Sequence, residues 1–280
     1  MGIEKQEYDE IQIPEELSGI LEKAENRRNR YKARFRLAAG VAACAVLLVT
    51  ANTPSAYAAL SEIPVVGTVV KVFHIGTGGQ RADGLGLKAE GEETVLKFSV
   101  TRSGENEQAS SMPSYEIERR LAPERLVITV NGIRDFDPQR FTEEAEQSPY
   151  VKRAYREIYL DDSAVRVVLE LEKDTGYEAV EYKEPGLLEI RLFQEKQEER
   201  EVWFVHSEKM EMSEELALLS EQLSEWKPSI AGTSDGYYVV SVGEFAAREE
   251  AEQLKEELEQ LEGLDIGFSV GHCLSSEKLQ

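Results

Sequence analysis

The sequence predicts an α+β multidomain protein with one transmembrane helix, a mainly β sandwich-like domain and a C-terminal βαββαβ domain. Three observations lead to this prediction. An uncharged run covers residues 37–60, and about 20 residues suffice to cross a bilayer. A middle region alternates apolar and polar residues with the period of a strand. A strand-plus-helix pattern then occurs twice near the C-terminus.

Composition limits the function classes that need to be considered. The chain has 280 residues, which predicts about two folded units, and a net charge of −22, which argues against nucleic acid as a partner. Its three histidines and two cysteines are scattered without metal-ligand spacing, and no glycine-rich phosphate loop precedes a helix. We therefore expect no enzyme: no catalytic residues, no metal site and no cofactor.

The first segment, residues 1–36, is predicted to be a cytoplasmic amphipathic helix followed by a basic stretch. Its apolar side chains recur at helical spacing and form one stripe. A lone amphipathic helix has no core of its own, so the stripe is predicted to bind a partner. The stripe consists of Leu17, Ile20, Leu21 and Ala24.

Residues 37–60 are the predicted transmembrane helix. A basic cluster at Arg27–Arg36 stands before the run and none follows it, so the positive-inside rule places the N-terminus in the cytoplasm. Two alternatives remain open. Ala56 and Ala58 fit a signal-peptidase cleavage site, which would make the run a signal peptide or a regulated cleavage site. Cys44 closes a sequence similar to a lipobox, which would make the chain a lipoprotein.

Residues 61–91 are read as a juxtamembrane segment and linker, and residues 92–193 as a mainly β domain. The linker prediction rests on the glycines between Gly76 and Gly86. The β domain contains runs rich in Val, Leu and Ile with period two, and the turn signal Asn131-Gly132 separates two of them. The strand candidates are Thr94–Thr101, Arg125–Val130, Val165–Leu171, Tyr177–Glu181 and Leu187–Phe193.

An internal repeat is the most informative feature of the C-terminal part. Residues 202–226 align with residues 237–261 without a gap, and each copy reads as a strand followed by an acidic helix. A further strand after each helix completes a ferredoxin-like βαββαβ domain over residues 200–273, with both helices on one face of a single sheet.

The other face of that sheet is predicted to be open and to hold an extended ligand. Side chains alternate between the two faces of a strand, which assigns five residues to the open face. The alternative is that these residues are only half-exposed or contact the neighbouring domain. The candidate ligand-binding residues are Phe204, His206, Tyr237, Val239 and Ser241.

The C-terminal unit resembles a SPOR domain over about residues 200–272. The segments that carry the resemblance are Tyr237–Phe245 and then Arg248–Ala251 with Leu254. This resemblance implies binding to glycan strands of peptidoglycan, with the open-face residues as the contacts. The first repeat departs from the pattern at His206–Met210, which puts the glycan affinity in question but not the fold.

The middle domain is similar to an AMIN domain, a β-sandwich found beside cell-wall amidases. This similarity implies targeting to the cell envelope. No zinc amidase domain fits in the rest of the chain. The matching segments are Arg125–Ile128, Ser148–Arg153, Val165–Leu169 and Leu188–Ile190.

The first 75 residues resemble membrane-bound anti-sigma factors of the anti-sigma-V type. The matching segments are Ile11–Leu17, the apolar run, Ala56–Ala58 and Ser61–Gly67. The resemblance implies a single-pass protein of the bacterial cytoplasmic membrane that holds an extracytoplasmic-function sigma factor, with extracytoplasmic C-terminal domains. No Cys or His precedes Cys44, so the zinc-binding type of anti-sigma domain is excluded.

These readings leave three functions open. The first is an anti-sigma-type envelope sensor whose outer region binds peptidoglycan. The second is a structural cell-wall, sporulation or division protein that peptidoglycan binding localises, with the N-terminus only an anchor. The third is an adaptor that positions a separate wall hydrolase.

Overall fold

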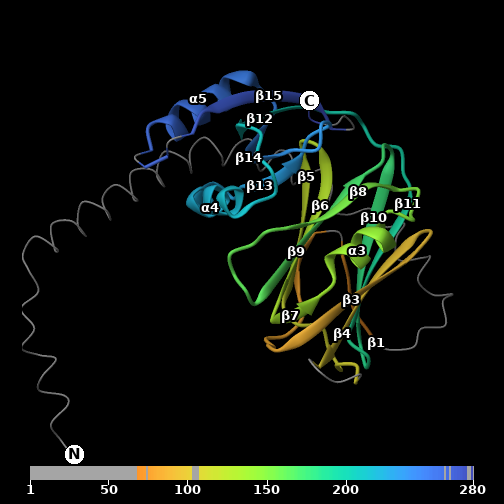
Figure 1. The fold of residues 1–280 in the computed structure, drawn as a ribbon. Coiled ribbons are helices and arrows are strands. Elements are labelled where there is room, and N and C mark those ends of the chain that lie inside the picture. The colour runs from red at the N-terminus through yellow and green to blue at the C-terminus, as the bar shows by residue number, and fades with distance from the viewer. Residues whose placement is uncertain are drawn as a thin grey trace, which may run out of the picture. The chain divides into compact units, whose positions relative to one another are not determined.

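The structure is a computed structural model that describes residues 68–73, 75–102, 107–261, 263–264, 266–275 and 279. Residues 60–280 form one compact unit. The described part of this unit contains fifteen strands and three α-helices, which build a β-sandwich and a smaller C-terminal domain (Figure 1).

The sandwich consists of two sheets whose strands are antiparallel except for the pair β3 and β7. Sheet A has six strands, in the order β1 (Thr68–Phe73), β10 (Thr175–Lys183), β11 (Leu187–Gln194), β4 (Val95–Arg102), β3 (Leu85–Glu92) and β7 (Ile133–Phe136). Sheet B has five strands, in the order β2 (Gly76–Gly78), β5 (Tyr115–Leu121), β6 (Glu124–Asn131), β9 (Ala164–Leu171) and β8 (Val151–Glu157).

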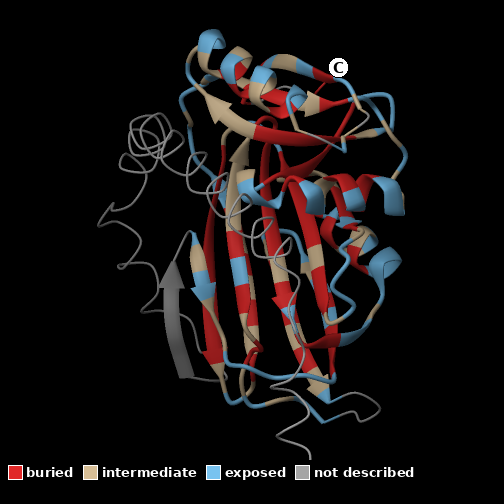
Figure 2. Cartoon of the chain, turned by 90° about the vertical axis from the view of Figure 1, so that its left-hand side faces the viewer, coloured by how far each residue is buried: buried red, intermediate tan, exposed pale blue. Residues whose placement is uncertain are grey.

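The hydrophobic core lies between the two sheets. Along β4 and β11, buried and more exposed residues alternate, which is what one buried face of a sheet requires. Figure 2 shows the buried residues running along the strands of the sandwich. Members of this core include Leu96, Phe98 and Ile190 from sheet A, and Ile128 and Leu169 from sheet B.

Helix α3 (Pro138–Ala145) packs against β3 of sheet A and β8 of sheet B. The side chain of Asp137 caps it by accepting a hydrogen bond from the backbone N–H of Arg140, and Pro138 occupies the first turn, where its missing N–H leaves no partner unsatisfied. Phe141 of this helix is fully buried in the sandwich core.

The C-terminal domain has the element order βαββαβ. Its elements are β12 (Glu201–Ser207), α4 (Glu214–Gln222) with the short 3-10 helix η2 (Ser224–Trp226), β13 (Ser229–Gly232), β14 (Tyr238–Phe245), α5 (Arg248–Glu259) and β15 (Phe268–Leu274). The sheet order is β13-β14-β12-β15, so the two central strands are the repeated ones. Leu216, Leu219, Leu254 and Leu258 of the helices are buried.

The structure corrects the predicted fold class and the predicted localisation. The described residues are mostly β, whereas the prediction was an α+β protein with a transmembrane helix. Helices α3, α4 and α5 have 8, 9 and 12 residues, and no helix in the described part combines the length and apolar character that spanning a membrane requires. The prediction of a single-pass protein of the cytoplasmic membrane is therefore wrong on this finding. The predicted span itself, residues 37–60, lies outside the described residues.

Sheet A and sheet B also recruit residues that the sequence assigned to a linker. Strands β1, β2 and most of β3 precede residue 92, where the β domain was predicted to begin. β1 pairs with β10, and β3 pairs with β4 along its whole length. Local glycine content predicted a linker here, but β1 and β2 pair with the distant strands β10 and β5, and β3 forms a hairpin with β4.

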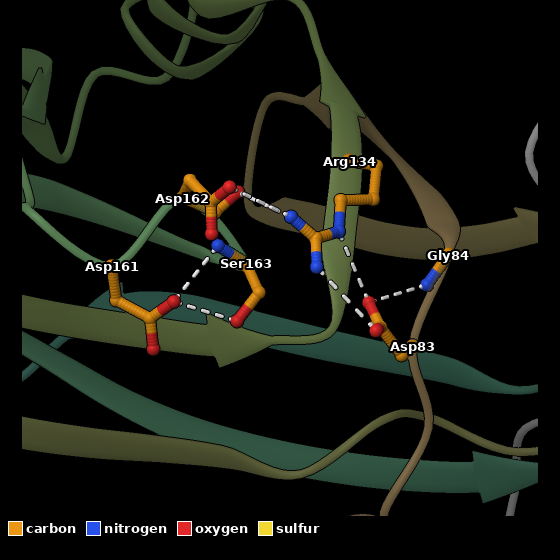
Figure 3. A network of polar contacts seen from close by, with 6 residues as sticks. All are labelled: Asp83, Gly84, Arg134, Asp161, Asp162 and Ser163. Carbon is orange, nitrogen blue, oxygen red and sulfur yellow. Dashed lines mark hydrogen bonds and ion pairs between the residues drawn. The ribbon is translucent and has the colours of Figure 1, made fainter.

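A polar network ties two connections, between β2 and β3 and between β8 and β9, to strand β7 (Figure 3). The Arg134 Nε lies 3.1 Å from Asp83 Oδ1, and the Arg134 Nη1 lies 3.1 Å from Asp162 Oδ2. The backbone N–H and the hydroxyl of Ser163 donate to Asp161 Oδ1. The hydrogen bond and charge of Arg134 lower the pKa of Asp83, and the Ser163 donors lower the pKa of Asp161.

This network predicts acid sensitivity that depends on Arg134. A carboxylate whose pKa is lower in the folded state stabilises the fold above its unfolded pKa, and this stabilisation is lost as the pH falls below about 4. Arg134→Ala removes the main cause at Asp83, so its Tm should fall less between pH 5 and pH 2.5 than that of the unaltered protein. The measurement is thermal unfolding across this pH range, with Arg81→Ala as an exposed control. Parallel curves for Arg134→Ala and the unaltered protein would contradict the prediction.

Candidate functional site

A row of polar side chains crosses all four strands of the C-terminal sheet on the face opposite the helices. Ser229 of β13 is paired with Ser241 of β14, Ser241 with His206 of β12, and His206 with Ser269 of β15. Cross-strand partners point to the same face of a sheet, so these four residues lie side by side in one line. We call them the polar row.

The polar row is closed at one end and open at the other. Ser229 is 2% exposed and Ser241 is 5% exposed, whereas His206 is half-buried and Ser269 is exposed. Gly271 of β15 is partly exposed and lies opposite Phe204 in the next pair of β12 and β15. The accessible part of the face is therefore its end at His206 and Ser269, since Phe204 of β12 and Cys273 of β15 are buried on the same face.

His206 is held in a defined orientation. Its Nδ1 lies 2.8 Å from the backbone carbonyl oxygen of Ser207, and its ring lies 5.6 Å from the ring of Phe204. A carbonyl oxygen only accepts hydrogen bonds, so in the neutral ring Nδ1 carries the hydrogen and Nε2 is an acceptor. The imidazole therefore presents a hydrogen-bonding atom to a ligand on this face.

The structure brings together four of the five residues predicted for the open face. Phe204, His206, Val239 and Ser241 lie on the face opposite the helices, as the alternation of β12 and β14 predicts. Tyr237 lies outside this group, in the turn before β14, and is 44% exposed.

The face is not open along its whole length. Phe204 and Val239 are each 2% exposed and pack in one hydrophobic cluster with Ala122, which lies in the turn between β5 and β6 of the sandwich. Contact with the neighbouring domain was the alternative that the sequence left open for these residues. For Phe204 and Val239 this alternative describes the structure.

Sequence reasoning missed Ser229 and Ser269, which complete the polar row. Both lie in strands whose existence was inferred from the repeat, but the repeat carries no information on which residues of β13 and β15 stand opposite Ser241 and His206. The register of a strand depends on its partner, and no pattern within one strand records which residue of the partner stands opposite.

A second polar row lies on the outer face of sheet B, beneath the C-terminal domain. Glu170 of β9 stands opposite Arg125 of β6 and opposite Arg153 of β8. Their chain neighbours Leu126, Ala154 and Leu169 belong to the core between the sheets, so these three charged side chains point away from it. Arg125 is completely buried and donates from Nη2 to Ser229 Oγ over 2.6 Å.

Burial shifts the titration of two groups in this contact. Burial raises the pKa of Glu157, although Arg166 and Arg125 act in the opposite direction. Burial also raises the pKa of Tyr155, whose hydroxyl donates to the backbone oxygen of Ile230 over 3.0 Å. Both groups support the contact of β8 with β13, and neither belongs to a group of residues arranged for metal binding, since none was found in the described part of the chain.

The sites predicted before residue 68 lie outside the described residues. They are the partner-binding stripe of Leu17, Ile20, Leu21 and Ala24 and the candidate cleavage site at Ala56 and Ala58. Both stay predictions, as does the sigma factor as a partner.

No family model matches the chain, and neither the curated proteins nor the solved structures contain a match to it. The similarities to SPOR, AMIN and anti-sigma domains therefore rest on the residues quoted for them.

Proposed function

We propose that the C-terminal domain is a non-enzymatic module that binds glycan strands of peptidoglycan along the polar row. The observation that carries the proposal is that hydroxyl and imidazole groups from all four strands lie in one line on the face opposite the helices. The spacing of neighbouring strands makes this line about 14 Å long. Such a line suits an extended ligand better than a compact one.

The chemistry of the row suits a polyhydroxylated ligand. Serine hydroxyls both donate and accept hydrogen bonds, and His206 adds an acceptor at Nε2, so the row complements sugar hydroxyl and acetamido groups. No member of the row is acidic or basic apart from the histidine. Positions 201–280 hold 18 Asp and Glu against 5 Lys and Arg, a balance of −13, which disfavours a polyanion as the ligand.

The exposed end of the polar row is where a ligand can begin to bind. Ser269 is exposed and His206 is half-buried, and the two pair directly across β12 and β15. The ring of Phe204 fills the space beside Gly271, where a Cβ would lie 2.5 Å from Phe204 Cζ, so a ligand meets side chains and not the backbone there. A glycan strand can therefore start at Ser269 and reach His206.

Two histidines on opposite faces of the same sheet give a matched test. His206→Ala removes the imidazole from the polar row, whereas His272→Ala removes an exposed imidazole that stacks on Trp203 with ring centroids 4.3 Å apart. Retention of the full-length chain on sacculi treated with amidase should fall about fivefold for His206→Ala, because one lost hydrogen bond to a ligand contributes about 1 kcal/mol. His272→Ala should bind as the unaltered chain does.

Two results would count against the proposal. If the unaltered chain is not retained on sacculi with or without amidase treatment, the domain does not bind glycan. If His272→Ala weakens retention as much as His206→Ala, the contact is not on the polar row.

Glycan binding by this domain is compatible with two wider functions, an anti-sigma-type envelope sensor and a structural cell-wall protein. An anti-sigma-type sensor would use it to recognise the state of the wall, and a structural protein would use it for localisation. The two differ in residues 1–36, where a sensor needs the stripe around Leu17 and Leu21 to bind a sigma factor.

A further inference from the structure

We propose that the sandwich gates the glycan-binding face: docking of the β5–β6 hairpin on the C-terminal sheet and occupation of the whole polar row by a glycan strand exclude each other. This inference rests on the proposed function. It adds a regulatory role for the sandwich, and it predicts that a bound glycan shifts the chain toward an undocked state.

The hairpin covers the inner half of the face. Ala122, at its turn, is fully buried in a cluster with Phe204, Val239 and Ala231 of the C-terminal sheet. A ligand lying over Ser241 and Ser229 would have to occupy the volume that the hairpin now fills. The glycan face in the docked state is therefore restricted to its outer half.

Backbone hydrogen bonds fix the hairpin at both ends of its turn. The N–H of Leu121 donates to Glu244 Oε1 over 2.6 Å, and the N–H of Glu124 donates to the carbonyl oxygen of Ser275 over 2.9 Å. Glu244 follows Gly243, whose φ of +71° accompanies a register shift between β12 and β14. This irregularity of the strand accompanies the contact of Glu244 with the sandwich.

Arg125 occupies the inner end of the polar row. Its guanidinium donates to Ser229 Oγ from Nη2 and to the carbonyl oxygens of Ala122 and Pro123 from Nη1. One side chain thus holds the hairpin turn and the first member of the row at the same time. A glycan that takes Ser229 as a partner must displace this hydrogen bond.

Arg153 and Glu170 of the second polar row form a latch between the sandwich and strands β13 and β14. Arg153 Nη2 donates to the hydroxyl of Tyr238 over 2.7 Å, and its guanidinium carbon lies 4.8 Å from the centre of the Tyr238 ring and 5.3 Å from that of Tyr155. Gly232 of β13 packs directly on this latch. A Cβ at Gly232 would overlap Arg153 Nη1 and lie 2.8 Å from Glu170 Oε1.

Two residues of β8 next to the latch, Tyr155 and Glu157, form hydrogen bonds with the backbone at the outer edge of β13. Tyr155 donates to the backbone oxygen of Ile230, and the N–H of Ile230 donates to Glu157 Oε1 over 3.3 Å. An edge strand needs such partners or it pairs with other chains. These contacts are polar, and water can replace polar partners when the domains part, whereas the cluster of Ala122 with Phe204 and Val239 opposes opening.

Docking of the hairpin and glycan binding are linked thermodynamically, and this linkage can be measured. If docking and full glycan occupancy exclude each other, any change that weakens docking strengthens glycan binding, and glycan binding weakens docking by the same factor. Gly232→Val weakens docking selectively because its new side chain meets Arg153 and Glu170 of the sandwich.

The experiment compares full-length variants for binding to glycan strands released from peptidoglycan by amidase. Gly232→Val and Arg153→Ala should each bind at least about fivefold more tightly than the unaltered chain, which is the lower end of usual coupling between sites. Ser234→Val, in the exposed turn after β13, and Arg156→Ala, exposed on β8, are the matched controls and should bind as the unaltered chain does. Hydrogen exchange of the unaltered chain should report faster exchange at Leu121 and Glu124 when glycan is added.

The outcomes separate the gate from the proposed function. Equal glycan affinity for the unaltered chain, Gly232→Val and Arg153→Ala overturns the gate and leaves glycan binding in place. Weaker binding by both variants also overturns it, because the sandwich would then support the site. Absence of binding by every form overturns the proposed function and with it the gate. Two variants from different domains guard against a folding defect in either one, which thermal unfolding detects.

Discussion

An Arg125→Ala variant is expected to lose about 3 kcal/mol or more of unfolding free energy, because three buried acceptors lose their donor and each buried polar group left unsatisfied costs about 1–3 kcal/mol. Arg125 is 0% exposed and makes three hydrogen bonds from its guanidinium. Its removal leaves Ala122 O and Ser229 Oγ without this donor. It also removes the cation opposite Glu170.

Urea unfolding measures this loss, and Arg156 provides the control. Arg156 lies on β8 and is exposed, so Arg156→Ala should change stability by less than about 0.5 kcal/mol. An Arg125→Met variant keeps the apolar stem and removes the charge, so it separates packing from electrostatics. A loss below about 1 kcal/mol for Arg125→Ala would contradict a structural role for the buried guanidinium.

A Phe141→Ala variant is expected to lose about 3–5 kcal/mol as well, by a different mechanism. Phe141 is 0% exposed, and its ring centroid lies 6.2 Å from that of Phe98 and 5.9 Å from that of Phe136. Truncation leaves a cavity that the rigid strands on both sides cannot fill. Helix α3 has only eight residues, so it depends on this side chain for its attachment.

Phe193 offers the matched control for this prediction. It is 39% exposed at the end of β11, so Phe193→Ala removes the same atoms without opening a cavity in the core. Chemical unfolding of the two variants should differ by at least about 2 kcal/mol. Equal losses would show that Phe141 does not anchor α3 to the sandwich.

The two expected losses also bear on the proposed function. Phe141 stabilises the sandwich itself, whereas Arg125 joins the sandwich to the C-terminal sheet through Ser229. If the gate exists, Arg125→Ala combines a loss of stability with stronger glycan binding. Phe141→Ala should lower stability alone.

Some elements could be predicted from the sequence because one local pattern decides them. β11 was predicted over Leu187–Phe193 and spans Leu187–Gln194, since its alternation records one buried face. β5 was missed because Tyr115–Leu121 reads Tyr-Glu-Ile-Glu-Arg-Arg-Leu, with four charged residues. Charged side chains can lie in a strand of this sheet only when other parts of the fold supply hydrogen-bond or ion-pair partners for them.

Helix α3 was missed for the same kind of reason. Its sequence, Pro138–Ala145, is short and has one large apolar residue near its centre. The start signal at Asp137 and Pro138 is present, but eight residues give too little periodicity to separate a helix from a loop. Packing of Phe141 between the sheets decides the outcome.

Part of the candidate site could be predicted from local patterns, and part of it could not. Alternation within β12 and β14 was enough to place Phe204, His206, Val239 and Ser241 on one face. The alignment of His206 with Ser269 and of Ser241 with Ser229 depends on strand register, which no local pattern records.

The sequence by itself determined the periodic strands of the middle region and the two copies of strand plus helix, because each follows from the spacing of apolar residues along one segment. Only the tertiary structure decided that Ala122 covers Phe204 and Val239 and that Arg125 reaches Ser229. These contacts join segments far apart in the chain. Their free energy comes from shape and charge that exist only once both domains have formed, so no pattern within either segment predicts them.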